Sequence, residues 1–307
     1  MTIATKRSSR LWISLALVAM LLMASVALTG CNGEGDDGAG GDAEKGTIHI
    51  GWIPWDEDIA ATYLWKRILE DEGYTVELTQ LDVAPVYSGL AAGDLDLFLD
   101  AWLPQTHSDY WAEYGGDLED LAVWYDNGAL TLAVPTYVDL DSIGDLDGNA
   151  DMFDGQIIGI EPGAGLTRVT REEAMPGYGL DDEYTLVEGS TTAMLAELDR
   201  TTSNEEPIVV TLWHPHWAYS AYDIKDLEDP QGLMGEAEEM HALARNGFST
   251  DFPEVAEWIS NFEMSDEALA SLEQLVINEY GSGQEEAAVE EWLSDPDNQA
   301  LVDSWLQ

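Results

Sequence analysis

The chain has 307 residues, of which 61 are acidic and 11 are basic, so its formal net charge is -50 at pH 7. A charge this negative argues against a nucleic-acid-binding protein, because phosphates are bound through Lys and Arg, and against a protein adsorbed on anionic lipid. The acidic residues are spread along the chain, which favours a solvated surface suited to high salt, where counterions screen the repulsion. With a single cysteine, no disulfide can form within the chain.

The first thirty residues have the features of a signal peptide. Three basic residues precede an uncharged apolar stretch over residues 11–28, and Cys31 follows shortly after it. We therefore predict a signal peptide over residues 1–30. The junction resembles the lipobox of secreted lipoproteins, which implies lipid attachment at Cys31. The alternative is an uncleaved membrane anchor, since a stretch of this length can just span a bilayer. Both interpretations place the rest of the chain on the outer, extracellular or periplasmic, face of the cytoplasmic membrane.

The remaining chain divides into a tether and a folded part. Residues 31–46 are rich in Gly and Asp, which predicts a flexible tether. After it, short apolar runs alternate with amphipathic segments, a pattern that predicts β-α-β units and a largely parallel sheet. The pattern restarts after residue 135. We therefore predict an α/β fold with a first lobe over 47–135, a second lobe over 136–220, and residues 221–307 returning to the first lobe with C-terminal helices.

The expected elements follow from the apolar pattern. Strands are predicted at 47–53, 75–81, 95–99, 129–135, 155–160, 184–187 and 207–212. Helices are predicted at 56–72, 86–92, 166–174 and 191–200, with further helices in the closing third. Asp56, Glu57 and Asp58 stand in the first turn of the helix at 56–72, where anions suit the helix dipole.

The twelve tryptophans include two informative groups. One group lies on helical apolar stripes and is predicted to be core: Trp65, Trp258, Trp292 and Trp305. The other group stands at or just beyond the carboxyl ends of predicted strands, the edge at which open α/β sheets bind ligands: Trp55, Trp102 and Trp213. Because these three come from both half-patterns, we predict that they share one aromatic site.

Aromatic rings in a chain with few basic residues suit a quaternary ammonium ligand. Such a group has no N–H to donate, and indole faces supply apolar contact together with cation–π attraction. If the ligand also carries a carboxylate, the site needs donors. The turn within residues 157–166 presents backbone N–H groups at the start of a helix, and His107 lies close enough to Trp102 for both to line one loop.

Several segments carry a resemblance to a known family. They are "WDEDIAATYLWK", "YTVELTQLDVAPVYSGLAAGDLDLFLDAWLPQTH", "IIGIEPGAG", "WHPHW" and "LARNGF". They resemble the glycine betaine-binding proteins of compatible-solute ABC transporters, the OpuAC and ProX type, over nearly all of residues 47–270. The resemblance implies a two-lobed periplasmic-binding-protein fold of type II that closes over its ligand at a hinge between the lobes.

The resemblance also implies the site. The trimethylammonium group would lie among Trp55, Trp102 and Trp213, and the carboxylate would be bound by the backbone amides of Gly165 and Leu166 and by His107. It implies that His216 and Trp217 support Trp213, that the partners are an ABC permease and its ATPase, and that the chain neither catalyses a reaction nor needs a cofactor.

Other interpretations stay open at this point. His214 and His216 could chelate zinc, although no further ligands appear at a matching spacing. A glycosidase with a carboxylate pair or a sugar-binding protein could also use tryptophans, but few Asn, Gln or Arg residues flank the three rings. Within the family, the ligand could be choline, carnitine or proline betaine.

Overall fold

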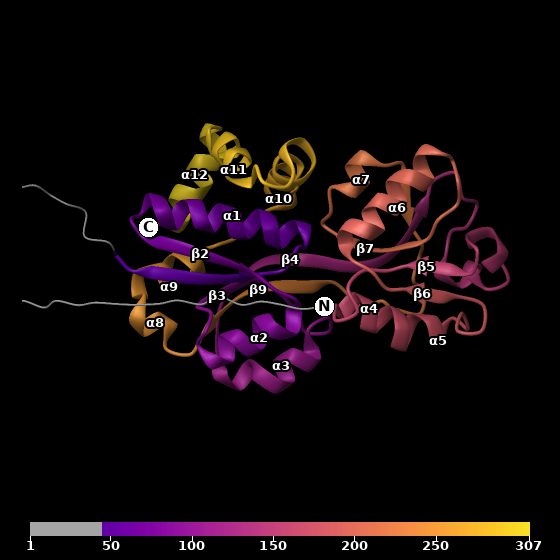
Figure 1. The fold of residues 1–307 in the computed structure, drawn as a ribbon, viewed down its shortest axis with the longest axis horizontal. Helices are drawn as coiled ribbons and strands as arrows, with labels where there is room; N and C mark the ends of the chain where they lie inside the picture. Colours follow the sequence, from indigo (N-terminus) through magenta and orange to yellow (C-terminus); the bar gives the residue numbers. More distant parts are fainter. Residues whose placement is uncertain (1–44) are drawn as a thin grey trace, which may run out of the picture. The chain divides into compact units, whose positions relative to one another are not determined.

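The computed structural model describes residues 45–307 (Figure 1). Cys31, the predicted signal peptide and nearly all of the predicted tether lie outside the described residues. Within 45–307, no helix is both long enough and apolar enough to cross a membrane.

Nine strands of the described chain form one sheet, in the order β2-β1-β3-β9-β4-β7-β5-β6, with β8 pairing to β4. The strands are β1 (Thr47–Trp52), β2 (Thr75–Gln80), β3 (Leu97–Leu103), β4 (Leu118–Pro135), β5 (Gln156–Ile158), β6 (Thr185–Val187), β7 (Val210–His214), β8 (Ile224–Asp226) and β9 (Glu238–Arg245).

The two ends of this sheet are parallel and its middle is antiparallel. β1 pairs in parallel with β2 and β3, and β5 pairs in parallel with β6 and β7. In the middle, β9 pairs antiparallel with β3 and β4, and β4 pairs antiparallel with β7 and β8. The expectation of a largely parallel sheet is therefore wrong for the middle strands. The physical reason is that β9, from the last third of the chain, inserts between β3 and β4, a long-range pairing that no local pattern encodes.

β4 is long enough to belong to both lobes. Its first part, up to Gly128, pairs with β9. From Ala129 onward it pairs with β7, and its last residues pair with β8. The chain thus passes from the first lobe to the second inside one continuous strand, and it returns between β8 and β9, beyond the predicted boundary at residue 220. The two lobes and this shared strand are visible in Figure 1.

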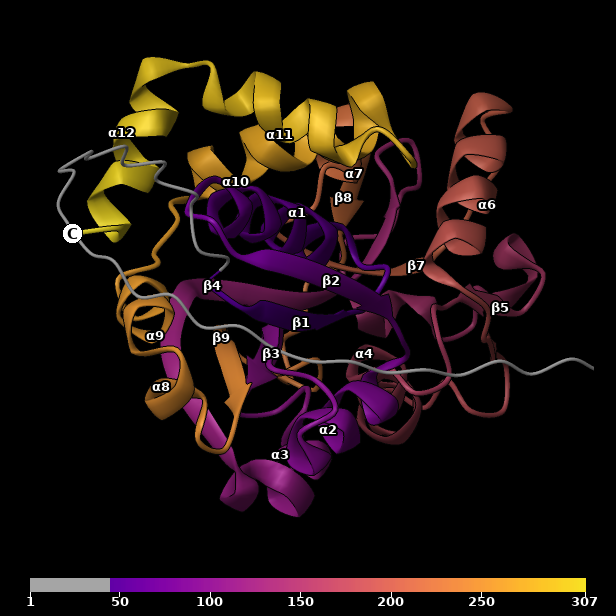
Figure 2. The same cartoon turned by 60° about the vertical axis from the view of Figure 1, so that its left-hand side comes forward.

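Helices cover both faces of the sheet in each lobe (Figures 1 and 2). In the first lobe, α1 packs with the C-terminal helices on one face, and α2 and α3 lie on the other. In the second lobe, α6 and α7 lie opposite α4 and α5. The helices are α1 (Asp56–Asp71), α2 (Val83–Ala92), α3 (Ser108–Tyr114), α4 (Gly165–Val169), α5 (Met175–Gly177), α6 (Thr191–Ser203), α7 (Ala218–Ala221), α8 (Phe248–Asp251), α9 (Pro253–Ser260), α10 (Asp266–Glu273), α11 (Glu285–Leu293) and α12 (Pro296–Trp305).

The tryptophans predicted to be core are buried. Trp65 on α1 stacks on Trp305 of α12 with ring centroids 6.1 Å apart, and Phe262 packs edge-on against both. Trp258 and Trp292 are buried as well. These rings join α1 to the C-terminal helices, so the helices after β9 are part of the first lobe's core.

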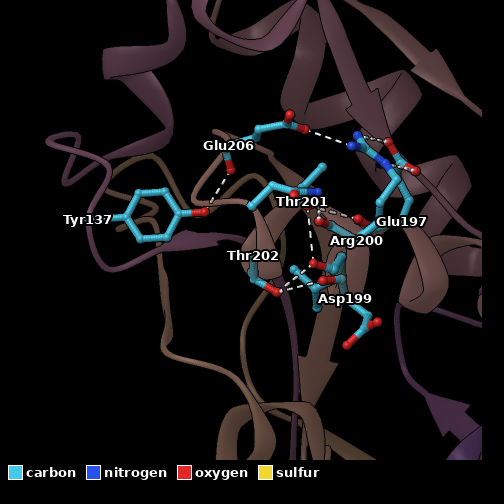
Figure 3. Close-up of polar contacts among 9 residues, drawn as sticks. Tyr137, Glu197, Asp199, Arg200, Thr201, Thr202 and Glu206 are labelled. Carbon is cyan, nitrogen blue, oxygen red and sulfur yellow. Dashed lines mark hydrogen bonds and ion pairs between the residues drawn. The ribbon is translucent and has the colours of Figure 1, made fainter.

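Acidic residues surround the basic ones. Within residues 45–307, each of the eight Lys and Arg side chains lies within ion-pair distance of an acidic residue. Near the end of α6, Arg200 binds both Glu197, at 2.8 Å, and Glu206, at 2.7 Å (Figure 3). Tyr137 donates a hydrogen bond to the carbonyl oxygen of the same Glu206. Most acidic residues are therefore left without a cationic partner.

Candidate functional site

A cavity between the two lobes brings together residues that the sequence analysis singled out. Trp55 directly precedes α1, Trp102 lies near the end of β3, and Trp213 lies near the end of β7. All three line the same cavity. The other lining residues come from both lobes and are Glu57, Thr106, Leu130, Ile160, Ala164, Gly165 and Leu166. Five of the six residues predicted to bind the ligand thus line this cavity.

Each of the three indole N–H groups donates to a carboxyl oxygen of an acidic side chain. Trp102 donates to Asp100 of its own strand, with nitrogen and oxygen 2.8 Å apart. Trp213 donates across the lobes to Glu57, at 2.9 Å, and Trp55 donates across the lobes to Glu161, at 3.3 Å. These bonds engage the indole nitrogens at the edges of the rings, so they do not themselves occupy the π faces.

His107, the sixth predicted residue, lies fully buried behind Trp55. Its ring stacks on the Trp55 ring with centroids 5.6 Å apart. Nδ1 accepts a hydrogen bond from the backbone N–H of Trp102 at 3.0 Å, and Nε2 has no hydrogen-bond partner. Burial, with a smaller contribution from the positive Arg168, lowers the pKa of His107 to about 3. The neutral ring therefore carries its proton on Nε2, as a buried donor without an acceptor.

The loop that carries His107 is held against the turn that contains Gly165. Glu238 at the start of β9 accepts hydrogen bonds from the backbone N–H groups of Gln105, at 2.6 Å, and Thr106, at 2.9 Å. A Cβ atom on Gly165 would lie 2.0 Å from the carbonyl oxygen of Thr106, so only glycine allows this approach. Gly165 and Leu166 open α4, where backbone N–H groups have no partner within the helix.

Buried carboxyl groups lie beside the cavity. Asp56, Glu57 and Asp58 of the first turn of α1 are buried, as are Asp100 and Glu273. The first-turn acids were expected only to complement the helix dipole, but Asp56 and Glu57 contact the second lobe, whereas Asp58 binds Ile53 and Thr62 of its own lobe. Burial raises the pKa of Glu57 to about 8 and that of Asp58 to about 7, and it raises those of Asp100 and Glu273 well above the usual range.

The segment 213–217 docks on that acidic turn. Trp217 donates to Asp56 with nitrogen and oxygen 2.5 Å apart, and Nε2 of His216 lies 3.0 Å from the same carboxylate. The His216 ring packs edge-on against Trp213 at 4.6 Å. His214 points elsewhere and pairs with Asp226 at 2.7 Å. Within residues 45–307, no group of three or more His, Cys, Asp or Glu side chains is arranged to hold a metal ion.

Five lining residues were not predicted from the sequence: the polar Glu57 and Thr106 and the apolar Leu130, Ile160 and Ala164. Glu57 is one of three acids directly after a strand-end tryptophan, but acids in the first turn of a helix are equally explained by the helix dipole. Thr106 stands between two recognised residues, Trp102 and His107, but no property of a lone threonine indicates which way it faces.

Comparison with known proteins gives the family. Residues 46–295 match the model of the substrate-binding domain of ABC-type glycine betaine transport systems, named OpuAC. The chain belongs to the OpuAC family. The members of this family are substrate-binding proteins of ABC transport systems.

Individual relatives agree with that assignment. A glycine betaine/carnitine transport binding protein, GbuC, of Listeria monocytogenes is 37% identical over 146 residues. That alignment covers 47% of this chain and 47% of GbuC, so it spans about half the length of this curated relative.

Solved structures extend the match over the OpuAC domain. The glycine betaine/L-proline-binding protein ProX of Borrelia burgdorferi is 34% identical with a TM-score of 0.79, and 85% of this chain and 97% of ProX are covered. Lactococcal OpuAC, in a closed conformation complexed with glycine betaine, is 29% identical with a TM-score of 0.78, and the coverage is 85% and 99%. A choline-binding protein in complex with choline is 26% identical with a TM-score of 0.76, and the coverage is 85% and 91%. The fold is thus the two-lobed, type II periplasmic-binding-protein fold.

Proposed function

We propose that this chain is the extracytoplasmic binding component of an ABC importer and that it captures glycine betaine for osmoprotection in the cavity between its lobes. The observation that carries the proposal is the set of three tryptophans from two lobes around one cavity, each with its N–H engaged by the carboxyl group of an acidic side chain. A trimethylammonium group would contact the indole faces, and cation–π attraction in a desolvated site is worth about 2 kcal/mol or more.

The ligand carboxylate would lie toward His107, Gly165 and Leu166. The support for this orientation is the unused N–H of the neutral His107 ring and the unused amides at the start of α4. Since the cavity draws residues from both lobes, a bound ligand would favour the closed form by its higher affinity for that form. The closed form would then dock on a membrane permease driven by a separate ATPase.

The chain would catalyse no reaction and would need no cofactor. Among the described residues that line the cavity, Glu57 is the one carboxyl group, whereas glycoside hydrolysis takes a pair. We further propose lipid attachment at Cys31, with the lobes on the outer face of the cytoplasmic membrane, and a surface adapted to high salt. These parts rest on the sequence pattern and on the excess of acidic residues.

The experiment is calorimetric titration of the purified binding domain with glycine betaine and with maltose. We expect betaine to bind and maltose not to bind. Trp102→Ala should weaken betaine binding by about 2 kcal/mol or more, because it removes one desolvated wall of the cation site. Trp52→Phe is the matched control, since Trp52 lies on β1 and does not line the cavity. Wild-type affinity in Trp102→Ala would refute the site.

A second candidate ligand class is the other quaternary amines. The choline complex of a solved relative and the carnitine in the name of GbuC favour testing them. A thermal-shift screen of betaine, proline betaine, carnitine and choline at high salt ranks them, because a ligand that binds only the folded state raises its melting temperature.

A further inference from the structure

Glu57 occupies an unusual position for a carboxyl group. It lines the cavity, is almost fully buried, and accepts the indole N–H of Trp213 from the opposite lobe at 2.9 Å. Within residues 45–307, no Lys or Arg side chain forms an ion pair with it. The cavity therefore has an acidic group in its wall with no resident cation beside it.

The groups around Glu57 are acidic as well. Asp56 and Asp58 flank it on α1, Asp100 faces it from β3, and Glu273 faces it from α10. The nearest basic ring on the second lobe, His216, is directed to Asp56. Ionising one more carboxyl group in this buried cluster is unfavourable without a positive charge. Burial, with the nearby Asp56 and Asp58, accordingly raises the pKa of Glu57 to about 8.

We propose that Glu57 sets the preference of this cavity for a positively charged head group, by facing that group as a carboxylate and releasing its proton to solvent when the cation enters. The inference rests on the proposed function, since it takes the cation to bind among the three tryptophans. Glu57 would then have two effects. Its hydrogen bond positions Trp213 whether the group is ionised or not, and its charge distinguishes a cation from a neutral group of the same shape.

The test compares two ligands of one shape and different charge. 3,3-Dimethylbutyrate has the carboxylate of glycine betaine and a tert-butyl group in place of trimethylammonium. In the wild type, betaine should bind far more tightly than the carbon analogue. In Glu57→Gln the side chain keeps an oxygen that can accept from Trp213, but the preference for betaine should fall about tenfold, which equals about 1.4 kcal/mol.

Asp56→Asn is the matched control. Asp56 is adjacent, buried and bonded to the same segment of the second lobe, but it does not line the cavity. Its loss should weaken both ligands without lowering the preference for betaine, because removing a neighbouring charge makes Glu57 easier to ionise. A merely structural role for Glu57 would give this same pattern, so an unchanged ratio in Glu57→Gln overturns the inference.

The pH profile is the second readout. Because an entering cation must displace a proton from Glu57 below pH 8, betaine affinity in the wild type should rise from pH 6.5 to pH 9, and in Glu57→Gln it should stay flat. A rise that persists in Glu57→Gln assigns the titration to another group and overturns the inference. If the wild type binds no betaine, the proposed function fails. If it binds betaine but Glu57→Gln behaves like the wild type, only this inference fails.

Discussion

At the residue scale, the hydrogen bonding of the buried His107 ring indicates which chemical group of a ligand it could bind. Its Nδ1 is occupied by the N–H of Trp102, and its Nε2 is a buried donor with no acceptor. An unsatisfied buried donor is costly, and the cost disappears when an acceptor arrives. A carboxylate is the acceptor that gains most from such a donor. The trimethylammonium group offers no acceptor, so in the proposed binding mode His107 would bind the carboxylate end of the ligand.

We therefore expect His107→Ala to weaken glycine betaine more than choline, which lacks the carboxylate. The expected difference is roughly tenfold or more, the value of one hydrogen bond to a charged group. Calorimetry with both ligands measures it. Any general loosening of the Trp102 loop lowers both affinities together, so equal losses would count against a direct contact. His49→Ala, on the exposed side of β1, is the control variant and should leave both affinities at their wild-type values.

Some residues around the cavity could be predicted from the sequence and others could not. The grouping of Trp55, Trp102 and Trp213 around one cavity could be predicted because each stands at or just beyond the end of a predicted strand, and strand ends share an edge. The role of Glu57 was not found, because its acidic neighbours fit a helix start equally well. Its significance depends on Trp213, which is far away in sequence and meets Glu57 only across the lobes.

At the scale of elements, β4 both joins the lobes and backs the cage. Gly128 lies where β4 passes from its pairing with β9 to its pairing with β7. A Cβ atom there would lie 2.7 Å from the Trp102 ring, which is closer than packed atoms approach. The ring is held from its other side by its bond to Asp100. The Trp102 ring thus packs directly against the backbone of β4 at Gly128, with no side chain between them.

Gly128→Ala should therefore weaken betaine binding, because the added methyl group displaces the Trp102 ring from its wall of the cavity. We expect a loss of about 1–3 kcal/mol, the usual range for overpacking a well-packed site. Titration calorimetry measures the affinity, and circular dichroism checks that the variant is folded. Gly116→Ala is the matched control, because nothing lies within 4 Å of its added Cβ atom. Equal affinities for the two variants would show that the contact is absorbed elsewhere.

Some strands and helices could be predicted from the sequence and others could not. The strand at 47–53 and the helix at 56–72 correspond closely to β1 and α1, because each has a clear apolar period and a clear stop. β9 was missed, since "EEMHALAR" is bounded by charged residues and its burial comes from neighbours on both sides. Only the end of β4 was predicted, because its first part has no regular alternation.

At the scale of the whole molecule, acidic side chains lie both on the surface and at the contact between the two lobes. The lobes meet through carboxylates of the first turn of α1 and through Trp213 and Trp217, so acidic groups join the lobes as well as cover the surface. The eight basic side chains of the described chain are already in ion pairs, each with at least one acid. Each basic side chain is therefore neutralised by its acidic neighbours, and the remaining acidic side chains repel one another over longer distances.

This balance predicts that salt stabilises the ligand-free protein. Raising KCl toward 1 M shortens the screening length to about 3 Å, which removes most repulsion between exposed acids and leaves close buried pairs nearly unaffected. The melting temperature from scanning calorimetry should rise steeply between low salt and 1 M.

Salt also strengthens hydrophobic burial in any protein, so the slope alone does not identify the cause. A variant with Asp181→Asn, Asp182→Asn and Glu263→Gln removes three exposed acids that do not line the cavity. It should melt at a higher temperature than the wild type in low salt and gain less from added KCl. If both proteins gain equally, repulsion among surface acids is not what the salt relieves.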